Sequence, residues 1–239
     1  MIIREAVILA GGLGTRLRSA VPDLPKCMAP LNGKPFLSYV INYLRQEGVK
    51  RFIFALGYRH EAIVEFLKKD FPSLIYESSI EDEPLGTGGA VKKALSLAEE
   101  KSILIVNGDT YYNLDTEILA SVHSLSGACC TLGLKPMHNF DRYGVVEIDN
   151  CSLITRFREK QFYESGLING GIYALRRDKF LEENLPEQFS FEKDYLEKFY
   201  TTRRMLGVVQ DEYFIDIGIP EDYERAQREL ATVTGQKAT

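Results

Sequence analysis

The stretch AVILAGGLGTRLRSAVPDLPK, residues 6–26, decides the fold of this chain. It begins with an apolar run, residues 6–10, which has the length and branched composition of a buried strand. Gly11, Gly12 and Gly14 follow directly. Glycines permit positive φ and leave backbone N–H groups accessible, so such a turn can point several amides at a phosphate. The stretch therefore predicts a buried strand followed by an anion-binding turn, although a simple tight turn into a helix also fits the glycines.

Two better-known phosphate-binding motifs do not match this turn. A P-loop requires Lys and then Ser or Thr after its second fixed glycine, whereas this turn continues with Thr15 and Arg16. The dinucleotide fingerprint GxGxxG, counted from Gly12, requires a third glycine where Leu17 stands. A phosphate here would instead meet Arg16 and, ten residues later, Lys26, two cations that suit phosphoryl oxygens.

The composition sets the class of protein. The chain has 239 residues, of which 45% are hydrophobic, so it can bury a sizeable core. We expect a single domain over residues 1–230 and a frayed tail over residues 231–239. The net charge of −5 argues against a nucleic-acid partner. The sequence contains neither an apolar run long enough to span a membrane nor a signal-peptide pattern, so we expect a cytoplasmic protein with no membrane partner.

Cysteine and histidine spacing gives no sign of a soft-metal site. The four cysteines, Cys27, Cys129, Cys130 and Cys151, have no C-x-x-C spacing and are predicted to be free thiols. The three histidines, His60, His123 and His138, lack metal-ligand spacing. Any bound metal is therefore expected to have oxygen ligands.

Helical and strand-like patterns alternate along the chain. Helical spacing is predicted over residues 35–47, 60–69 and about 87–98, with Thr87 as N-cap of the last, and strands over 51–56, 74–76 and 102–106. Asp115 is predicted to cap a further helix. Extended pieces at 128–135, 144–148, 153–157 and 168–175 follow, and then helices at about 190–200 and 220–230. This order predicts an α/β fold, a Rossmann-like three-layer αβα arrangement with a mixed, mainly parallel central sheet.

Two carboxylates lie next to strand-like runs. Asp109 follows the run 102–106, and Asp216 lies in the run FIDIG, residues 214–218. Ligands of parallel sheets bind beyond the carboxyl ends of the strands, where both Gly11 and Asp109 are expected. Two carboxylates together with phosphate oxygens can hold one Mg²⁺, although Asp109 also fits a simple Asx turn.

Two further short motifs are weaker taken alone. Glu159 and Lys160 follow the strand-like run 153–157, where a surface ion pair is the simpler interpretation. Asn169, Gly170 and Gly171 open an apolar strand, and these glycines also fit a packing role.

Taken together, the motifs resemble those of the sugar-1-phosphate nucleotidylyltransferases over residues 1 to about 230. They occur in the family's order, as Gly11–Leu17, Pro25–Lys26, Pro84–Gly88, Gly108–Asp109, Glu159–Lys160, Asn169–Gly171 and Asp216–Gly218. Within the family, the runs 79–90, 143–145 and 214–223 look closest to the heptose 1-phosphate guanylyltransferases. The related mannose 1-phosphate enzymes share the segment EPLGT, residues 83–87.

The resemblance implies a reaction of a nucleoside triphosphate with a sugar 1-phosphate, giving a nucleotide sugar and pyrophosphate. The attacking phosphate monoester has a second pKa of about 6, so it is already charged at neutral pH and needs no general base. Catalysis is then mainly positioning and charge neutralisation.

The resemblance also implies roles for individual residues. Arg16, Lys26 and Asp109 are expected to be catalytic, and Asp109 and Asp216 to bind the cofactor Mg²⁺. The nucleotide is expected to contact Ala10, Gly11, Gly12, Gly14, Thr15, Glu81, Gly86 and Thr87. The sugar phosphate is expected to contact Gly144, Glu159, Lys160, Asn169 and Gly170. Cys27 departs from many relatives, and either a reactive thiol or a buried inert one fits the sequence.

The acidic run Glu81–Glu83 stands where the family reads the base. One carboxylate can accept both N1–H and N2–H₂ of guanine, whereas uracil and thymine present a single donor between two acceptors. Glu81 is therefore predicted to select GTP, with Glu83 second because it abuts Pro84 and turn geometry can hold it instead. A solvated acidic loop is the simpler alternative.

Other functions remain open at this point. The substrates could be mannose 1-phosphate with GTP, or the transfer could be of a uridylyl or thymidylyl group. A catalytically silent regulatory subunit on the same fold is disfavoured by the intact charged motifs. A glycosyltransferase would normally show Asp-x-Asp, and Asp109–Tyr111 does not. We expect a monomer or a homodimer.

Overall fold

A computed structural model describes residues 1–12 and 24–235 of the chain. Its strands are β1 (Glu5–Leu9), β2 (Pro30–Leu31), β3 (Lys34–Pro35), β4 (Arg51–Leu56), β5 (Ile75–Ile80), β6 (Ser102–Asn107), β7 (Thr110–Tyr112), β8 (Cys130–Phe140), β9 (Val145–Ile148), β10 (Ile154–Arg158), β11 (Tyr163–Arg176), β12 (Met205–Val209) and β13 (Phe214–Asp216). Its helices are α1 (Phe36–Gln46), α2 (His60–Asp70), α3 (Gly86–Leu95), α4 (Thr116–Ser126), α5 (Arg177–Leu181), α6 (Glu197–Phe199) and α7 (Pro220–Val233), with a 3₁₀ turn η1 (Lys26–Met28) and a π-helical turn η2 (Phe191–Leu196).

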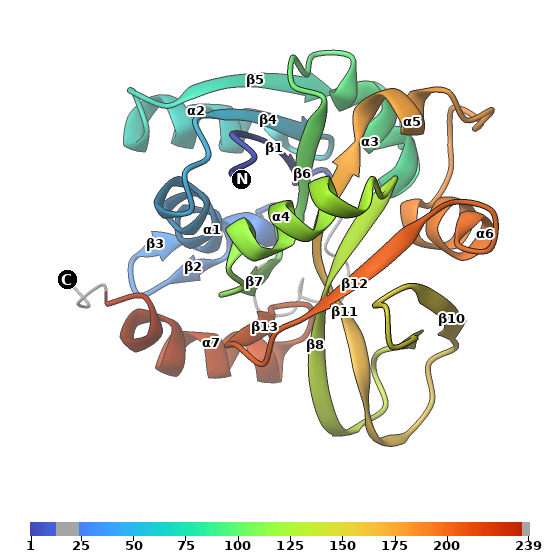
Figure 1. The fold of residues 1–239 in the computed structure, drawn as a ribbon. Helices are drawn as coiled ribbons and strands as arrows, with labels where there is room; N and C mark the ends of the chain where they lie inside the picture. The colour runs from blue at the N-terminus through green and yellow to red at the C-terminus, as the bar shows by residue number, and fades with distance from the viewer. Residues whose placement is uncertain (13–23, 236–239) are drawn as a thin grey trace.

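One mixed sheet organises the described residues. Seven of their strands lie in the order β12-β8-β11-β6-β1-β4-β5. The block β6-β1-β4-β5 is parallel, β12 is parallel to β8, and only β11 runs antiparallel to its two neighbours. In Figure 1 β5 lies at the top edge, and the long strands β8 and β11 extend to the bottom, beside β9 and β10. The predicted mixed, mainly parallel sheet is confirmed.

Helices cover both faces of the sheet, as Figure 1 shows. One core contains side chains of α1, α2, α4 and α7, and the other contains side chains of α3, α5 and η2. In β1, Ala6 and Ile8 belong to the first core and Val7 to the second. Successive strand side chains point to opposite faces, so a strand buried on both faces needs an unbroken apolar run. The three-layer αβα arrangement predicted from the sequence is therefore confirmed.

The start of α3 differs from the prediction. The helix begins at Gly86, Leu85 occupies the N-cap position, and Thr87 is not a cap. The Thr87 hydroxyl instead accepts a hydrogen bond from the backbone N–H of Phe191 at 2.8 Å. The glycines around Thr87 explain this contact, because a Cβ at Gly88 would collide with the Phe189 ring. Tertiary packing against residues 189–191 thus replaced the local cap that the sequence suggested.

The other helix ends agree more closely with the prediction. Asp115 caps α4, since its carboxylate accepts hydrogen bonds from the backbone N–H groups of Glu117 and Ile118. Helix α7 opens at Pro220, as predicted, but runs on to Val233, beyond the boundary expected at residue 230. Residues 236–239 lie outside the described part.

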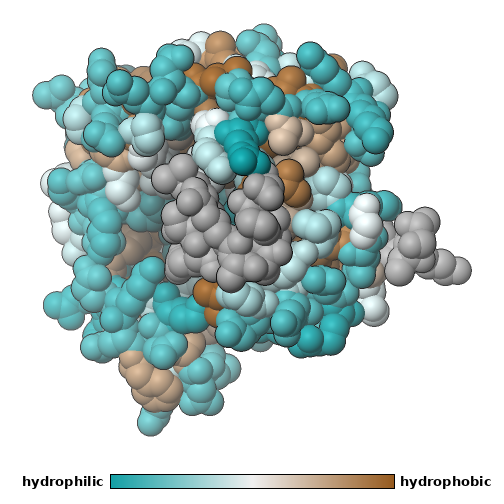
Figure 2. Space-filling view, turned by 180° about the vertical axis from the view of Figure 1, so that it is seen from behind, coloured by the Kyte–Doolittle hydropathy of each residue, from teal (hydrophilic) through white to brown (hydrophobic). Residues whose placement is uncertain are grey.

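The face shown in Figure 2 is mainly hydrophilic. In the view of Figure 2 hydrophilic residues predominate, and hydrophobic ones appear in small separate groups. None of the described helices combines the length and apolar composition needed to cross a membrane. The four cysteines are free, as predicted.

Candidate active site

A cavity of about 390 Å³ lies at the carboxyl ends of the parallel strands. Three strand ends contribute to its wall, through Leu9 of β1, Ala55 of β4 and Asn107 of β6. The residues that follow these strands, among them Ala10, Gly11, Gly12 and Asp109, also line it. Strands β1 and β6 are direct neighbours, with Leu9 opposite Asn107. The predicted meeting of Gly11 and Asp109 at one edge of the sheet is therefore present.

The cavity reaches across several strand ends. Glu81, which follows β5, lines it together with Asp109, which follows β6. Strands β4 and β1 lie between β5 and β6, so three strand spacings, about 14 Å, separate these two sheet positions. This span is comparable to an extended nucleotide, with the base at one end and phosphates at the other.

The glycine turn after β1 packs closely against neighbouring backbone. A Cβ at Gly11 would lie 3.0 Å from the backbone nitrogen of Gly57, in the loop after β4. Glycine at position 11 therefore lets two loops approach each other at the cavity wall. Gly14, Thr15 and Arg16 lie outside the described residues.

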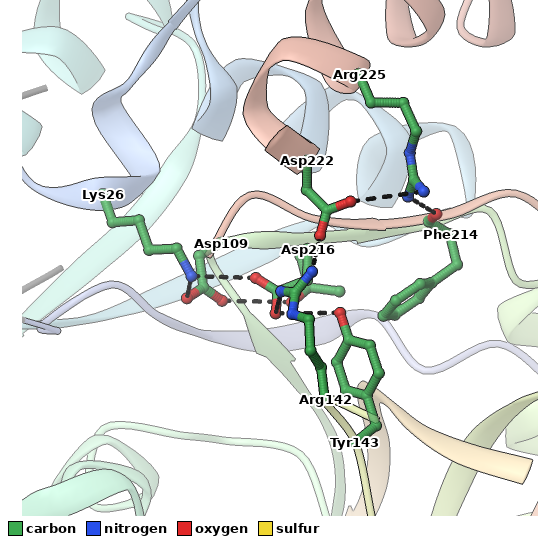
Figure 3. Close-up of polar contacts among 9 residues, drawn as sticks. Lys26, Asp109, Arg142, Tyr143, Phe214, Asp216, Asp222 and Arg225 are labelled. Carbon is green, nitrogen blue, oxygen red and sulfur yellow. Dashed lines mark hydrogen bonds and ion pairs between the residues drawn. The ribbon is translucent and has the colours of Figure 1, made fainter. Parts of the chain in front are cut away.

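Lys26 lies between two carboxylates. Its Nζ donates to Asp109 Oδ2 at 2.6 Å and to Asp216 Oδ1 at 3.1 Å (Figure 3). The Lys26 side chain is only 11% exposed. Burial by itself lowers the pKa of Lys26, but the charges of Asp109 and Asp216 outweigh it, so the pKa is raised. Lys26 therefore carries a positive charge at neutral pH inside the cavity.

The two carboxylates meet because of one strand pair. Strands β7 and β13 are antiparallel, and Thr110, next to Asp109, lies opposite Asp216. The backbone N–H of Ile217 also donates to the carbonyl of Asp109 at 3.1 Å. A Cβ at Gly218 would lie 3.0 Å from Lys26 Nζ, so glycine leaves room for the ammonium group.

A second basic group supports Asp216 from its other side. Arg142 donates to Asp222 in the first turn of α7, and its guanidinium lies 3.9 Å from Asp216 Oδ2 (Figure 3). The hydroxyl of Tyr143 donates to the same oxygen at 3.5 Å. Sequence reasoning missed the pairing of Arg142 with Asp222, although the run YGV, residues 143–145, and the α7 start were both noted.

These carboxylates suit a hard divalent cation. Asp109 and Asp216 contact the same ammonium group, so both face one point. Among the described residues no group of three or more His, Cys, Asp and Glu could hold a metal. Mg²⁺ commonly takes one or two carboxylates and completes its shell with water and phosphate oxygens. The donor set therefore fits Mg²⁺ bound together with a phosphate substrate.

The cysteine of the cavity wall is inert. Cys27 lines the cavity but is 3% exposed. Burial, with a contribution from Asp109, raises the pKa of its thiol to about 12. The thiol therefore stays protonated at neutral pH, and the unreactive alternative for Cys27 holds.

Glu81 lines the opposite part of the cavity, as does Gly86. Its Oε2 accepts a hydrogen bond from the backbone N–H of Leu85 at 3.1 Å. Burial raises the pKa of the Glu81 carboxyl, an effect that the Leu85 N–H and the charge of Lys93 partly offset. Glu83 is exposed and is not part of the cavity wall.

The residues expected at the sugar phosphate lie outside this cavity wall. The carboxylate of Glu159 is 81% exposed and pairs with Lys193 at 2.7 Å, and Lys160 is exposed. Asn169 Nδ2 donates to the Tyr173 hydroxyl at 2.8 Å. Gly170 packs on the Tyr112 ring, where a Cβ would come within 2.5 Å of Cδ1. Gly144 packs against the carbonyl of Arg158. Their roles toward a sugar stay predictions.

The structure adds two polar residues to the wall that were not singled out as site residues. Asn107 ends β6, immediately before Gly108 and Asp109. Glu192 comes from the π-helical turn η2 and accepts a hydrogen bond from Thr87 Oγ1 at 2.9 Å. The sequence gives no local signal for this contact, because Glu192 and Thr87 are 105 residues apart.

Comparison with known proteins identifies the family of the chain. The sequence model of the Nucleotidyl transferase family matches residues 5–233. The chain is 47% identical over 226 residues to D-glycero-alpha-D-manno-heptose 1-phosphate guanylyltransferase of Aneurinibacillus thermoaerophilus, an alignment covering 95% of this chain and 98% of that protein. The protein of the same name from Campylobacter jejuni is 46% identical, with 92% of this chain and 96% of that protein covered.

A solved structure is similar throughout. The crystal structure of HddC from Yersinia pseudotuberculosis complexed with GMP-PN has a TM-score of 0.85 and 39% sequence identity. The match covers 95% of this chain and 100% of that chain.

Proposed function

The chain belongs to the nucleotidyl transferase family, and on this premise we propose that it transfers GMP from GTP to D-glycero-α-D-manno-heptose 1-phosphate, releasing pyrophosphate. The observation that carries this proposal is the near-full-length similarity to two proteins of that activity, at 47% and 46% identity. The product is GDP-D-glycero-α-D-manno-heptose.

The shape of the cavity supports the nucleotide half of the proposal. Glu81 lies at one part of the wall, and the glycine turn with Lys26 and Asp109 lies at another. We infer that guanine meets Glu81, because its two adjacent donors match one carboxylate. One Glu81 oxygen accepts from Leu85, and this contact holds the side chain in place for the base.

Lys26 is proposed to neutralise charge that moves in the reaction. The sugar phosphate oxygen attacks the α-phosphorus, and negative charge builds up on the leaving pyrophosphate. An ammonium group held by two carboxylates is positively charged and positioned before substrates arrive, which favours the transition state at little reorganisation cost. Arg16, in the same loop motif, is proposed to share this role.

Asp109 and Asp216 are proposed as the ligands of Mg²⁺. The ion would neutralise phosphate charge and orient the triphosphate for in-line attack. Both carboxylates lie beside Lys26, so a cation bound there would be close to the group that we assign to the phosphates.

The sugar 1-phosphate is proposed to enter from the side of β9, β10 and the adjoining part of β11. Gly144, Glu159, Lys160, Asn169 and Gly170 lie on or beside these strands. Carboxylate and amide oxygens there suit the hydroxyl groups of a heptose. Lys160 would hold the phosphate.

The test is a panel of the four common nucleoside triphosphates against heptose, mannose and glucose 1-phosphates, read by pyrophosphate release. We expect release to be fastest with GTP and heptose 1-phosphate, and to depend on Mg²⁺. Preference for UTP or dTTP would exclude the guanylyl assignment. Preference for mannose 1-phosphate with GTP would keep the chemistry and change the sugar. No release with any pair would favour a silent regulatory subunit.

A further inference from the structure

Glu192 is a cavity carboxylate with half of its hydrogen-bonding capacity unused. Its Oε2 accepts from Thr87 Oγ1 at 2.9 Å and from Ser190 Oγ at 3.3 Å. No described residue donates a hydrogen bond to its Oε1 or forms an ion pair with it. The side chain is partly exposed and lines the cavity. Its second oxygen is therefore available to a bound molecule.

The electrostatics of the cavity make this carboxylate costly for an anionic substrate. Glu81 and Asp109 already line the same wall, and the described basic residue among them, Lys26, is committed to Asp109 and Asp216. A further unpaired negative charge repels a triphosphate and a sugar phosphate. Such a group is compensated only if the bound substrate presents hydrogen-bond donors to it.

The local fold holds Glu192 in one place. It lies in the first turn of η2, a π-helical turn that Ser190 caps by accepting from the backbone N–H of Lys193 at 3.1 Å. Isolated π-helical turns often occur at functional sites. The N-terminal end of α3 packs against the residues just before η2, because the backbone N–H of Gly88 donates to the carbonyl of Phe189 at 2.9 Å.

The position of Glu192 identifies the kind of donor. It lies beside Thr87, in the part of the cavity expected to hold the nucleoside. The ring of Phe191, the residue before it, packs on the ring of Tyr173 with centroids 5.1 Å apart, and the Tyr173 hydroxyl is the partner of Asn169. Asn169 is in the group proposed to meet the sugar. Between the base of the nucleotide and the phosphate of the sugar, the two substrates present the hydroxyl groups of their sugar rings as hydrogen-bond donors.

We propose that Glu192 is a specificity-determining residue that accepts hydrogen bonds from sugar-ring hydroxyl groups of the substrates, a proposal that rests on the proposed function. The ring is either the ribose of GTP or the sugar of the sugar 1-phosphate, since both present neighbouring hydroxyl groups. The experiment below distinguishes these two sources.

Glu192→Gln is the informative variant because of Thr87. The Thr87 oxygen accepts from the Phe191 N–H, so its proton is left to donate to residue 192. In the variant, the amide oxygen of Gln takes this proton, and the NH₂ group faces the cavity. The neutral NH₂ group then replaces the charged Oε1 acceptor, so a substrate hydroxyl loses the hydrogen bond that it donated to the carboxylate.

The experiment measures kcat/KM for pyrophosphate release with matched hydroxyl and deoxy substrates. GTP is compared with 2′-deoxy- and 3′-deoxy-GTP, and heptose 1-phosphate with its monodeoxy analogues. We expect the wild type to prefer one hydroxyl substrate over its deoxy analogue, and Glu192→Gln to reduce that ratio about ten- to a hundredfold, because a hydrogen bond to a charged group is worth about 1.5–3 kcal/mol. Glu197→Gln is the control, since Glu197 pairs with Lys193 at 3.0 Å and does not line the cavity.

The outcome names the source of the hydroxyl or rejects the proposal. A change confined to the nucleotide pair assigns the ribose, and one confined to the sugar pair assigns the sugar 1-phosphate. If Glu192→Gln slows hydroxyl and deoxy substrates equally, or if the wild type shows no such preference, the proposal is wrong. Glu192→Asp keeps an acceptor and should retain part of the preference, which guards against a folding defect in the first variant. Wild-type pyrophosphate release with GTP and heptose 1-phosphate tests the proposed function separately.

Discussion

Replacing Lys26 with methionine should lower the free energy of unfolding and make it depend on a divalent cation that Asp109 and Asp216 bind. Methionine keeps much of the side-chain volume but leaves Asp109 and Asp216 facing each other without the ammonium group. Removing one partner of a buried ion pair costs about 3–5 kcal/mol. Asp109 is 36% exposed and Asp216 19%, so solvent screens part of this effect. We therefore expect the free energy of unfolding to fall by about 2 kcal/mol.

A divalent cation should then recover part of the loss. Mg²⁺ that binds the two carboxylates only in the folded state stabilises it by about 1.4 kcal/mol at ten times its dissociation constant. In the wild type the Lys26 ammonium competes for the same oxygens, so Mg²⁺ alone should change stability much less. The pKa of Lys26 is raised in the fold, so the difference in stability between the two proteins should be full from neutral pH to about pH 10 and shrink at higher pH.

The assay is urea unfolding of both proteins, first with EDTA and then with increasing MgCl₂. The double variant Lys26→Met with Asp109→Asn is the control, because it removes one carboxylate and should lose most of the Mg²⁺ response. Equal stability of Lys26→Met and wild type in EDTA would show that the ion pairs contribute little. A loss of stability that Mg²⁺ does not recover would remove the two carboxylates from the metal site.

Four other substitutions test separate parts of the structure. Glu81→Gln should reduce the preference for GTP over UTP about ten- to a hundredfold; in the wild type this preference should weaken as pH falls through the raised pKa of Glu81, at a higher pH than for an ordinary carboxyl, and an unchanged ratio in the variant would exclude Glu81 as the base reader. Asp216→Asn should raise the Mg²⁺ concentration needed for half-maximal pyrophosphate release while the circular dichroism spectrum stays the same; an unchanged Mg²⁺ titration would contradict its assignment. His123 is 1% exposed, and burial lowers its pKa to about 4, so the unfolded chain takes up a proton first and stability should fall by up to about 3 kcal/mol as pH drops from about 6.5 to 4; chemical unfolding of His123→Asn across this range should show a flatter profile, and a slope equal to that of the wild type would assign the loss to other groups. Gly89→Ala should lower the melting temperature, because the new Cβ would collide with the Glu187 carbonyl and lie 2.7 Å from Leu85 Cβ; an unchanged melting temperature would mean that this loop shifts without cost.

Local patterns in the sequence were sufficient for most of the fold. Strands β1, β4 and β6 each contain a run of four or five apolar residues, and α1 and α2 have helical apolar spacing, so each was predicted within a few residues of its observed bounds. Asp115 was identified as an N-cap because its contacts reach only two and three residues along the chain. The N-cap predicted for α3 was wrong because Thr87 contacts residues that are 104 and 105 positions away in the chain.

In the candidate site too, some features were predictable from the sequence and others were not. The sequence alone determined that a glycine turn and Asp109 follow buried parallel strands, because strand ends and turn residues are local properties of the chain. Only the tertiary structure decided that Lys26 contacts both Asp109 and Asp216, which lie 83 and 190 residues from it, and that Glu192 reaches the cavity wall beside Thr87. Charged side chains carry no periodic signal for their partners. Their partners depend on how β7 pairs with β13 and how η2 packs on α3, and burial of apolar surface across the whole domain determines that packing.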